Sequence, residues 1–145
     1  MICVLEDMDL SSNNLDGTLP SAFLESCGAL KLLNISGNSL TGGGFPFPPS
    51  LRTLDLSSNQ LSDAGLLNYT LTGCHNVQYL DLSANGQFAG GITAIAPCSK
   101  LAVLDLSSNV LSGALPANLV AAAPATMTHL SVARNKTGVK TRDDS

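Results

Sequence analysis

Leucines recur along this chain in a fixed order, with polar residues between them. Over residues 51–61, and again over 101–111, a leucine is followed by further leucines three and five residues later, then by an asparagine and a final leucine. In the central part, two leucines flank one polar residue, which is the period-2 alternation of a short strand with one buried face. Each copy of the pattern therefore predicts one short strand.

The pattern occurs six times with its asparagine in the same place. The six residues are Asn13, Asn38, Asn59, Asn85, Asn109 and Asn135. The intervals between them are 25, 21, 26, 24 and 26 residues, within the roughly 20–29 residues typical of leucine-rich repeats. Because a side-chain amide both donates and accepts hydrogen bonds, each asparagine is expected to point inward and satisfy backbone groups of its own and the neighbouring copy. We therefore predict a structural asparagine ladder.

Successive copies run in the same direction, and each returns to the next strand through about 15 residues, so the strands should stack as a parallel sheet about 4.8 Å apart. The predicted fold is a leucine-rich-repeat solenoid, an α/β-type horseshoe segment. Short parallel strands line its concave face, and irregular or 3-10 turns with brief helices form its convex side. We expect about six repeats over residues 1–138, without caps, followed by a polar C-terminal tail over 139–145.

Glycine and proline predict the course of the chain on the convex side. Residues 15–20 and 111–116 share the form L-x-G-x-L-P, in which glycine permits a positive φ and proline ends the extended piece. The segments that follow, 21–27 and 117–123, are each expected to form about two helical turns. The stretch 42–49, with three glycines and three prolines, is expected to cross in extended form instead.

The composition narrows the classes of function. Of the 145 residues, 44% are apolar and 12% are charged, so the chain has a core to bury and is not disordered. A net charge of -4 without any basic run argues against nucleic-acid binding. No stretch approaches the ~20 apolar residues of a membrane helix, and the start lacks the features of a secretory signal. We expect no nucleic-acid partner and no membrane segment in this chain.

The combination of L-x-x-L-x-L-S-x-N-x-L with L-x-G-x-L-P resembles the plant extracellular leucine-rich-repeat class over about residues 2–138. The cysteines three residues before Leu30 and Leu101, the run 42–57 and the segment 63–85 are similar to the N-terminal ectodomain repeats of brassinosteroid-receptor-like kinases of grasses. The resemblance implies a parent glycoprotein at the plasma membrane with its repeats on the extracellular side. Such receptors also carry a signal peptide, repeat caps, a hormone-binding island, one membrane helix and a Ser/Thr kinase.

Only early repeats of that design match this sequence, since no kinase motif and no island position occurs in it. The chain is therefore expected to be a non-catalytic ectodomain fragment that recognises a protein or peptide partner, either a ligand or a co-receptor. Two alternatives stay open. One is a soluble inhibitor or decoy that resembles the plant polygalacturonase inhibitors, and the other is a truncated product with no independent function.

Outward positions of the strands should form columns on the concave face. One column consists of Asp9, Asn34, Asp55, Asp81, Asp105 and Ser131, and its neighbour of Asp7, Leu32, Thr53, Tyr79, Val103 and His129. Stacked carboxylates are expected to raise one another's pKa and to attract a basic partner. These columns are the predicted binding surface, although polar residues here also fit the simpler role of keeping an exposed strand face polar.

Few residues suggest catalysis or a metal site. His75 and His129 lie about two copies apart, and neither stands beside a serine or cysteine in a nucleophile turn. The four cysteines form no C-x-x-C metal site. We expect no catalytic residue, no cofactor and no metal ligand, and we place both histidines on the surface.

Three cysteines follow the repeat, because Cys27, Cys74 and Cys98 each stand three residues before the first apolar residue of a copy. Cys74 and Cys98 belong to adjacent copies, so their Cα atoms should lie about 5 Å apart, within the range of a disulfide. Buried free thiols fit the same positions equally well. Cys3 has no evident partner.

The glycosylation motif Asn-x-Ser/Thr begins at Asn34, Asn68 and Asn135. Asn34 and Asn68 are candidate acceptors, and Asn68 is the better one because it falls in an expected loop. Asn135 is a ladder residue whose side chain should point inward, so we expect it to be unmodified.

Overall fold

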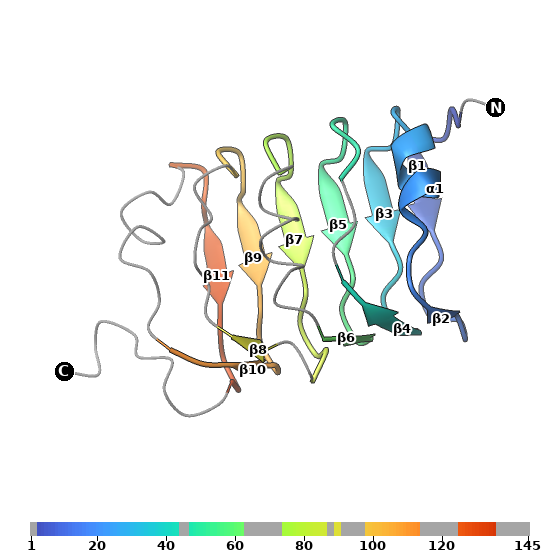
Figure 1. Cartoon of the computed structure of the whole chain (residues 1–145). Coiled ribbons are helices and arrows are strands. Elements are labelled where there is room, and N and C mark those ends of the chain that lie inside the picture. The colour runs from blue at the N-terminus through green and yellow to red at the C-terminus, as the bar shows by residue number, and fades with distance from the viewer. Residues whose placement is uncertain are drawn as a thin grey trace.

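The computed structural model describes residues 3–43, 47–62, 74–86, 89–90, 98–113 and 125–135. Over these residues the chain contributes six strands to one sheet (Figure 1). The elements in chain order are β1 (Asp7–Asp9), β2 (Asp16–Gly17), α1 (Ser21–Ser26), β3 (Leu32–Asn34), β4 (Ser39–Gly42), β5 (Thr53–Asp55), β6 (Gln60–Leu61), β7 (Tyr79–Asp81), β8 (Ala89–Gly90), β9 (Val103–Asp105), β10 (Val110–Leu111) and β11 (His129–Ser131).

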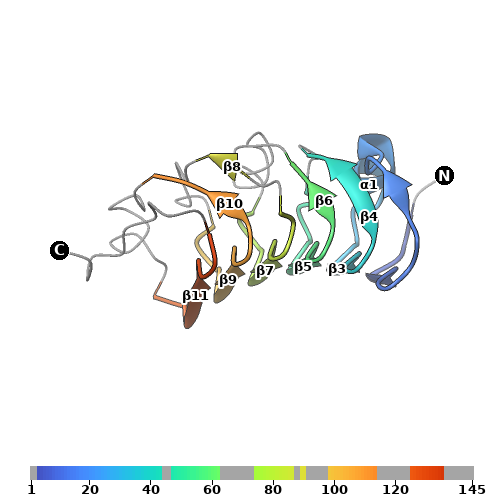
Figure 2. The ribbon, with the colours of Figure 1, turned by 90° about the horizontal axis from the view of Figure 1, so that it is seen from below.

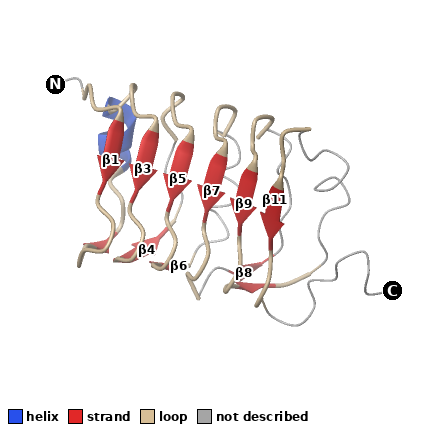
Figure 3. Cartoon of the chain, turned by 180° about the vertical axis from the view of Figure 1, so that it is seen from behind, coloured by secondary structure: helices blue, strands red, loops and turns tan. Residues whose placement is uncertain are grey.

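The repeat strands form one parallel sheet in the order β1-β3-β5-β7-β9-β11, and Figures 1 and 3 show them side by side from opposite directions. Equivalent positions of neighbouring repeats are paired throughout, as where Asp81 lies between Asp55 and Asp105. The predictions of one strand per copy and of parallel stacking are therefore confirmed. Because the register is constant, residues at one repeat position form a straight column.

Leucines at the inward positions of the strands form the core. Leu33, Leu54, Leu80 and Leu104 are at most 1% exposed, because each is covered by the same position of the repeats on both sides. The first repeat differs, since β1 is an edge strand. Its apolar residues Val4, Leu5, Leu10 and Leu15 are 77%, 50%, 37% and 40% exposed.

A second set of strands follows the repeat strands and pairs separately: β4 lies between β2 and β6, and β8 pairs with β10. Figure 2 shows them along a different side of the molecule from the six-stranded sheet. The one helix among the described residues is α1, which begins directly after Pro20 and packs Leu24 into the core. It confirms the helix predicted over 21–27, whereas the helix predicted over 117–123 and the middle of the 42–49 stretch fall outside the described residues. In the described part of the chain, no helix has the length and apolar character needed to cross a membrane.

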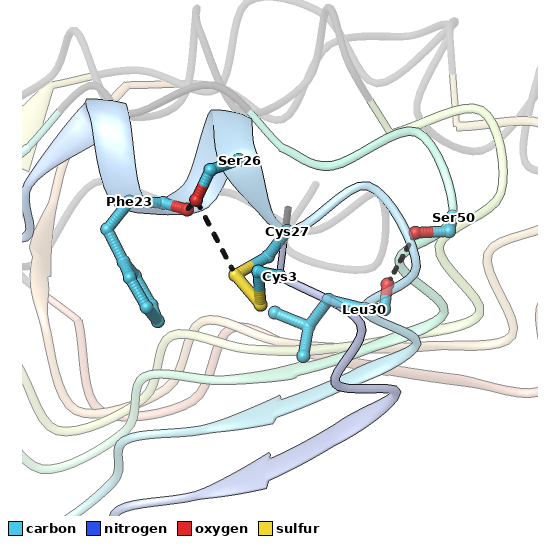
Figure 4. The surroundings of a disulfide bond; sticks show 6 residues. All are labelled: Cys3, Phe23, Ser26, Cys27, Leu30 and Ser50. Carbon is cyan, nitrogen blue, oxygen red and sulfur yellow. Dashed lines mark hydrogen bonds between the residues drawn. A yellow bond between two sulfur atoms is a disulfide. The ribbon is translucent and has the colours of Figure 1, made fainter. Parts of the chain in front are cut away.

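Two disulfides join neighbouring repeats. Cys74 is bonded to Cys98 with 4.9 Å between their Cα atoms, and Cys3 is bonded to Cys27 with 4.6 Å between theirs (Figure 4). The expectation that Cys3 lacks a partner is wrong. Cys3 stands two residues before the first leucine of its copy, Leu5, rather than three, so it lies outside the repeat position that the other cysteines share. A disulfide requires only a short Cα–Cα distance and not equivalent positions.

The turn after each repeat strand contains a residue with a positive φ immediately before the ladder asparagine. This residue is Gly37 in the second repeat, with a φ of 65°. In the other repeats it carries a side chain, at φ values of 54° to 56°, and the residues are Ser12, Ser58, Ala84, Ser108 and Arg134. Left-handed backbone is therefore part of the repeat and is accepted even where no glycine is present, at a cost of about 1–2 kcal/mol per residue.

Replacing Gly37 with alanine is expected to lower the free energy of unfolding by about 1 kcal/mol, because a Cβ is disfavoured at this φ. The added atom would meet nothing closer than 3.5 Å, so backbone conformation alone carries the effect. Gly28→Ala is the matched control, since its Cβ meets no atom within 4 Å and its φ lies outside the left-handed region. That variant should be neutral or slightly stabilising. Urea denaturation measures the free energy of unfolding of both variants. If both lose the same amount, the positive φ of Gly37 is not the cause of the loss.

Candidate functional site

The outward side chains of the six-stranded sheet form the two predicted columns on the concave face. Register pairs Leu32 with Thr53, Thr53 with Tyr79 and Tyr79 with Val103, and His129 continues this column beside Val103. The first four of these side chains are half-buried, and that of His129 is exposed. The structure therefore brings together a continuous surface from residues that are up to 97 positions apart in the sequence, from Leu32 to His129.

The carboxylate column also has a structural role that the sequence analysis missed. In five repeats the side-chain Oδ1 of this column accepts a hydrogen bond from the backbone N–H two residues later, at 2.8 to 3.0 Å. The acceptors are Asp9, Asn34, Asp55, Asp81 and Asp105. This Asx turn ends β1, β3, β5, β7 and β9. The signal for it was present in the sequence as an Asp or Asn two residues before a serine.

The expectation that these carboxylates raise one another's pKa is wrong for Asp9. Hydrogen bonds from the side chain and the backbone of Ser11 stabilise the ionised form, and they lower the pKa of Asp9 below its ordinary value. Its partner in the register is Asn34, which is neutral. The hydrogen bonds with Ser11 therefore outweigh the opposing effect of desolvation at this position.

Tyr79 lies at the centre of the densest charge on this face. Its hydroxyl donates to Asp81 Oδ2 at 3.3 Å. Partial burial raises the pKa of the Tyr79 phenol, and the negative charges of Asp81, Asp55 and Asp105, together with that hydrogen bond, raise it further. The phenol is therefore a neutral hydrogen-bonding group at physiological pH, on the flank of three carboxylates from β5, β7 and β9.

Five of the six predicted ladder asparagines connect neighbouring repeats beneath this face. In the third repeat, Asn59 Nδ2 donates to the carbonyl oxygens of Ile35, Leu56 and Ser57, and its Oδ1 accepts from the Leu40 N–H at 3.0 Å. Asn38, Asn85, Asn109 and Asn135 likewise bond to the preceding repeat. Asn13 bonds only within its own repeat among the described residues, through Leu10 and Ser11. The ladder holds the strands at a constant register and so positions the columns above it.

The remaining candidate residues are dispersed. His75 lies in an exposed turn and His129 on the exposed side of β11, while Asn68 falls outside the described residues. Asn34 occupies the carboxylate column, and Asn135 belongs to the ladder. Within the described ranges, no three His, Cys, Asp or Glu side chains gather closely enough to hold a metal ion.

Comparison with known proteins relates the chain to one repeat family. Family models described as leucine rich repeat match residues 4–61, 49–90 and 100–121. Over 133 residues, 92% of this chain, the sequence is 62% identical to Brassinosteroid LRR receptor kinase BRL3 of Oryza sativa subsp. japonica. The matched part is 11% of that relative, so the chain spans about a tenth of its length.

Solved plant structures share the fold. The BIR3–SERK2 complex of Arabidopsis thaliana matches with a TM-score of 0.76 and 28% identity, over 93% of this chain and 70% of the solved one. The ectodomain of the Arabidopsis receptor kinase HAESA, solved with an extended IDA peptide hormone, matches with a TM-score of 0.73 and 30% identity, over 88% of this chain and 21% of the solved one. Two of the neighbours thus come from complexes with a protein or a peptide.

Proposed function

Because this chain belongs to the leucine-rich repeat family and is similar over most of its length to a brassinosteroid LRR receptor kinase, we propose that it recognises a protein or peptide partner. The partner is a co-receptor or a ligand, and it binds to the concave face. We propose further that the parent protein is a receptor kinase of the plasma membrane with these repeats on its extracellular side. The role of the chain itself is recognition rather than catalysis.

The observation that carries this proposal is the contrast between the two outward columns. The Asx-turn column is nearly uniform, and in five of the repeats its Asp or Asn accepts the hydrogen bond of the turn. The neighbouring column makes no such turn and varies from Leu32 and Val103 to Thr53 and Tyr79. Half-buried aromatic and aliphatic groups beside fixed carboxylates provide both apolar contact and directed hydrogen bonding, which are the components of a protein-binding centre.

The fold supports the same reading, since repeat solenoids bind partners along the extended face that their stacked units create. Of the solved neighbours, one is a complex of BIR3 with SERK2 and another is HAESA with a peptide hormone. A partner that crosses β7 and β9 would contact Tyr79 and Val103 together. Tyr79 supplies the largest side chain of that contact.

Isothermal titration calorimetry of this chain against the extracellular domain of SERK2 tests the proposal. Tyr79→Ala is expected to weaken binding at least tenfold, or about 1.4 kcal/mol, as removal of a central aromatic side chain does. Phe23→Ala on α1 is the control, because Phe23 is 38% exposed on the convex side. This variant should bind with the same affinity as the unmodified chain. Absence of binding by the unmodified chain, or weaker binding in the Phe23 variant alone, would contradict the proposal. Inhibition of a polygalacturonase would favour an inhibitor role instead.

A further inference from the structure

Asn34 is the one amide in the column of carboxylates formed by Asp9, Asp55, Asp81 and Asp105. It begins the sequence Asn34-Ile35-Ser36, which fits the glycosylation motif. We propose that Asn34 carries an N-linked glycan in the secreted protein, and that this glycan shields the N-terminal part of the concave face. The partner-binding surface is then confined to β7, β9 and β11, a consequence that rests on the proposed function.

The local geometry presents the Asn34 amide nitrogen for modification. Asn34 Oδ1 accepts two hydrogen bonds from Ser36, one from its backbone N–H at 3.0 Å and one from its hydroxyl at 2.7 Å. Both bonds use the oxygen of the amide, and within the described part of the chain its Nδ2 donates none. The hydroxyl of the motif and the acceptor side chain are thus already in contact, while the nitrogen stays available on an open sheet face.

Asn135, which begins a second motif of this kind, has the opposite arrangement. Asn135 Nδ2 donates to the carbonyl oxygens of Leu106, Val132 and Ala133, at 3.0, 2.8 and 3.4 Å. A glycan on that nitrogen would remove at least one of these bonds and force the side chain out of the ladder. The same three-residue motif is therefore compatible with modification at Asn34 and incompatible with it at Asn135.

The transfer also leaves the turn intact. The oligosaccharide donor is linked to a lipid diphosphate through the anomeric carbon of its first sugar. The Asn34 Nδ2 forms a bond to that carbon, the bond from the carbon to the phosphate oxygen breaks, and the lipid diphosphate leaves with the electron pair. One amide proton passes to a base of the transferring enzyme. The product keeps its carbonyl oxygen, so Oδ1 continues to accept both bonds from Ser36.

The position of Asn34 determines which residues the glycan covers. Its partners in the register are Asp9 on one side and Asp55 on the other. A chain of several sugars is much wider than the about 4.8 Å that separates neighbouring strands, so it covers both of these carboxylates. Tyr79 and Val103 lie two and three strands from Asn34, at increasing distance from the sugar attachment.

Peptide mapping of the chain secreted from plant or insect cells behind a heterologous signal peptide tests the modification. Trypsin cuts after Lys31 and Arg52, and the peptide 32–52 is expected to carry a glycan that peptide N-glycosidase removes. Asn135 is mapped in a separate chymotryptic digest, because trypsin leaves it in a dipeptide, and it is expected to be unmodified. Ser36→Ala and Asn34→Asp both remove the motif and keep the Oδ1 acceptor, so each should lose this glycan. Asp81→Asn creates Asn-Leu-Ser at the equivalent position of the fourth repeat and should gain one. An unmodified peptide 32–52 overturns the proposal.

Carbodiimide labelling of the carboxylates tests the shielding without any partner. In the glycosylated chain, Asp9 and Asp55 are expected to react several-fold more slowly than in Ser36→Ala, while Asp105 reacts at the same rate in both. Equal rates at Asp9 and Asp55 would refute the shielding. Because neither measurement involves SERK2, failure of the proposed function and failure of this inference give different results.

Discussion

Asn59→Ala is expected to lower the free energy of unfolding by about 3 kcal/mol. The side chain is 6% exposed and makes four hydrogen bonds, three as donor and one as acceptor. Its loss leaves the buried Leu40 N–H without its acceptor, and a buried unsatisfied group costs about 1–3 kcal/mol. The carbonyl oxygens of Ile35 and Leu56 lose donors as well. Chemical denaturation followed by circular dichroism measures the loss.

Asn13→Ala is the matched control for this ladder prediction. Asn13 occupies the same repeat position, but it is exposed and donates only to Leu10 and Ser11 of its own repeat. Water can replace these bonds, so the variant should change the unfolding free energy by less than about 0.5 kcal/mol. If Asn59→Ala and Asn13→Ala have the same effect, the bonds between repeats are not the source of stability that we assign to the ladder.

Removal of the Cys74–Cys98 disulfide by the double variant Cys74→Ala/Cys98→Ala is expected to cost about 3 kcal/mol. The bond closes a loop with a sequence separation of 24, and a loop of that size restricts the unfolded chain by an entropy of this order. Both cysteines are fully buried in the middle of the repeats. Under non-reducing conditions, the midpoint of the main unfolding transition should therefore be lower in this variant than in the unmodified chain.

Cys3→Ala/Cys27→Ala tests the same loop length at a different place. The sequence separation is again 24, but this bond fastens the first repeat, whose Val4 and Leu5 are exposed. An edge repeat has a neighbour on one side only, so it can detach while the others stay folded. We expect faster proteolysis before α1 and a smaller change in the main transition. A main transition lowered as far as by loss of Cys74–Cys98 would contradict this difference.

The repeat made much of the fold predictable. A constant order of leucines and asparagines requires a constant register, since each inward leucine must contact its equivalents and each Asn59-type amide must reach the preceding turn. The strands, their order and the inward direction of the ladder follow from that requirement, and the helix after Pro20 follows separately from the L-x-G-x-L-P segment before it. The columns that include Tyr79 and Asp81 follow as well, because a constant register places equivalent positions of successive repeats next to each other in the sheet.

Interactions outside the repeat were not predictable in this way. The Cys3–Cys27 bond joins non-equivalent positions, and only the folded chain brings them to 4.6 Å. The lowered pKa of Asp9 arises from hydrogen bonds with Ser11 within one turn, of which the backbone bond is 2.9 Å long. The order of the column places carboxylates near one another but does not reveal these bonds.

The sequence by itself determined the class of this protein, its repeat length, its core and the residues that face outward, because all of these depend on periodicity. The tertiary structure decided which bonds those outward residues make. It showed that one column is held by Asx turns in five repeats and that the neighbouring column makes no such turn. It also distinguished two asparagines that both begin the motif Asn-x-Ser/Thr, because Asn34 bonds through its amide oxygen whereas the amide nitrogen of Asn135 donates three bonds. Periodicity assigns a residue to a face, but only the folded backbone determines which of its atoms are already bonded.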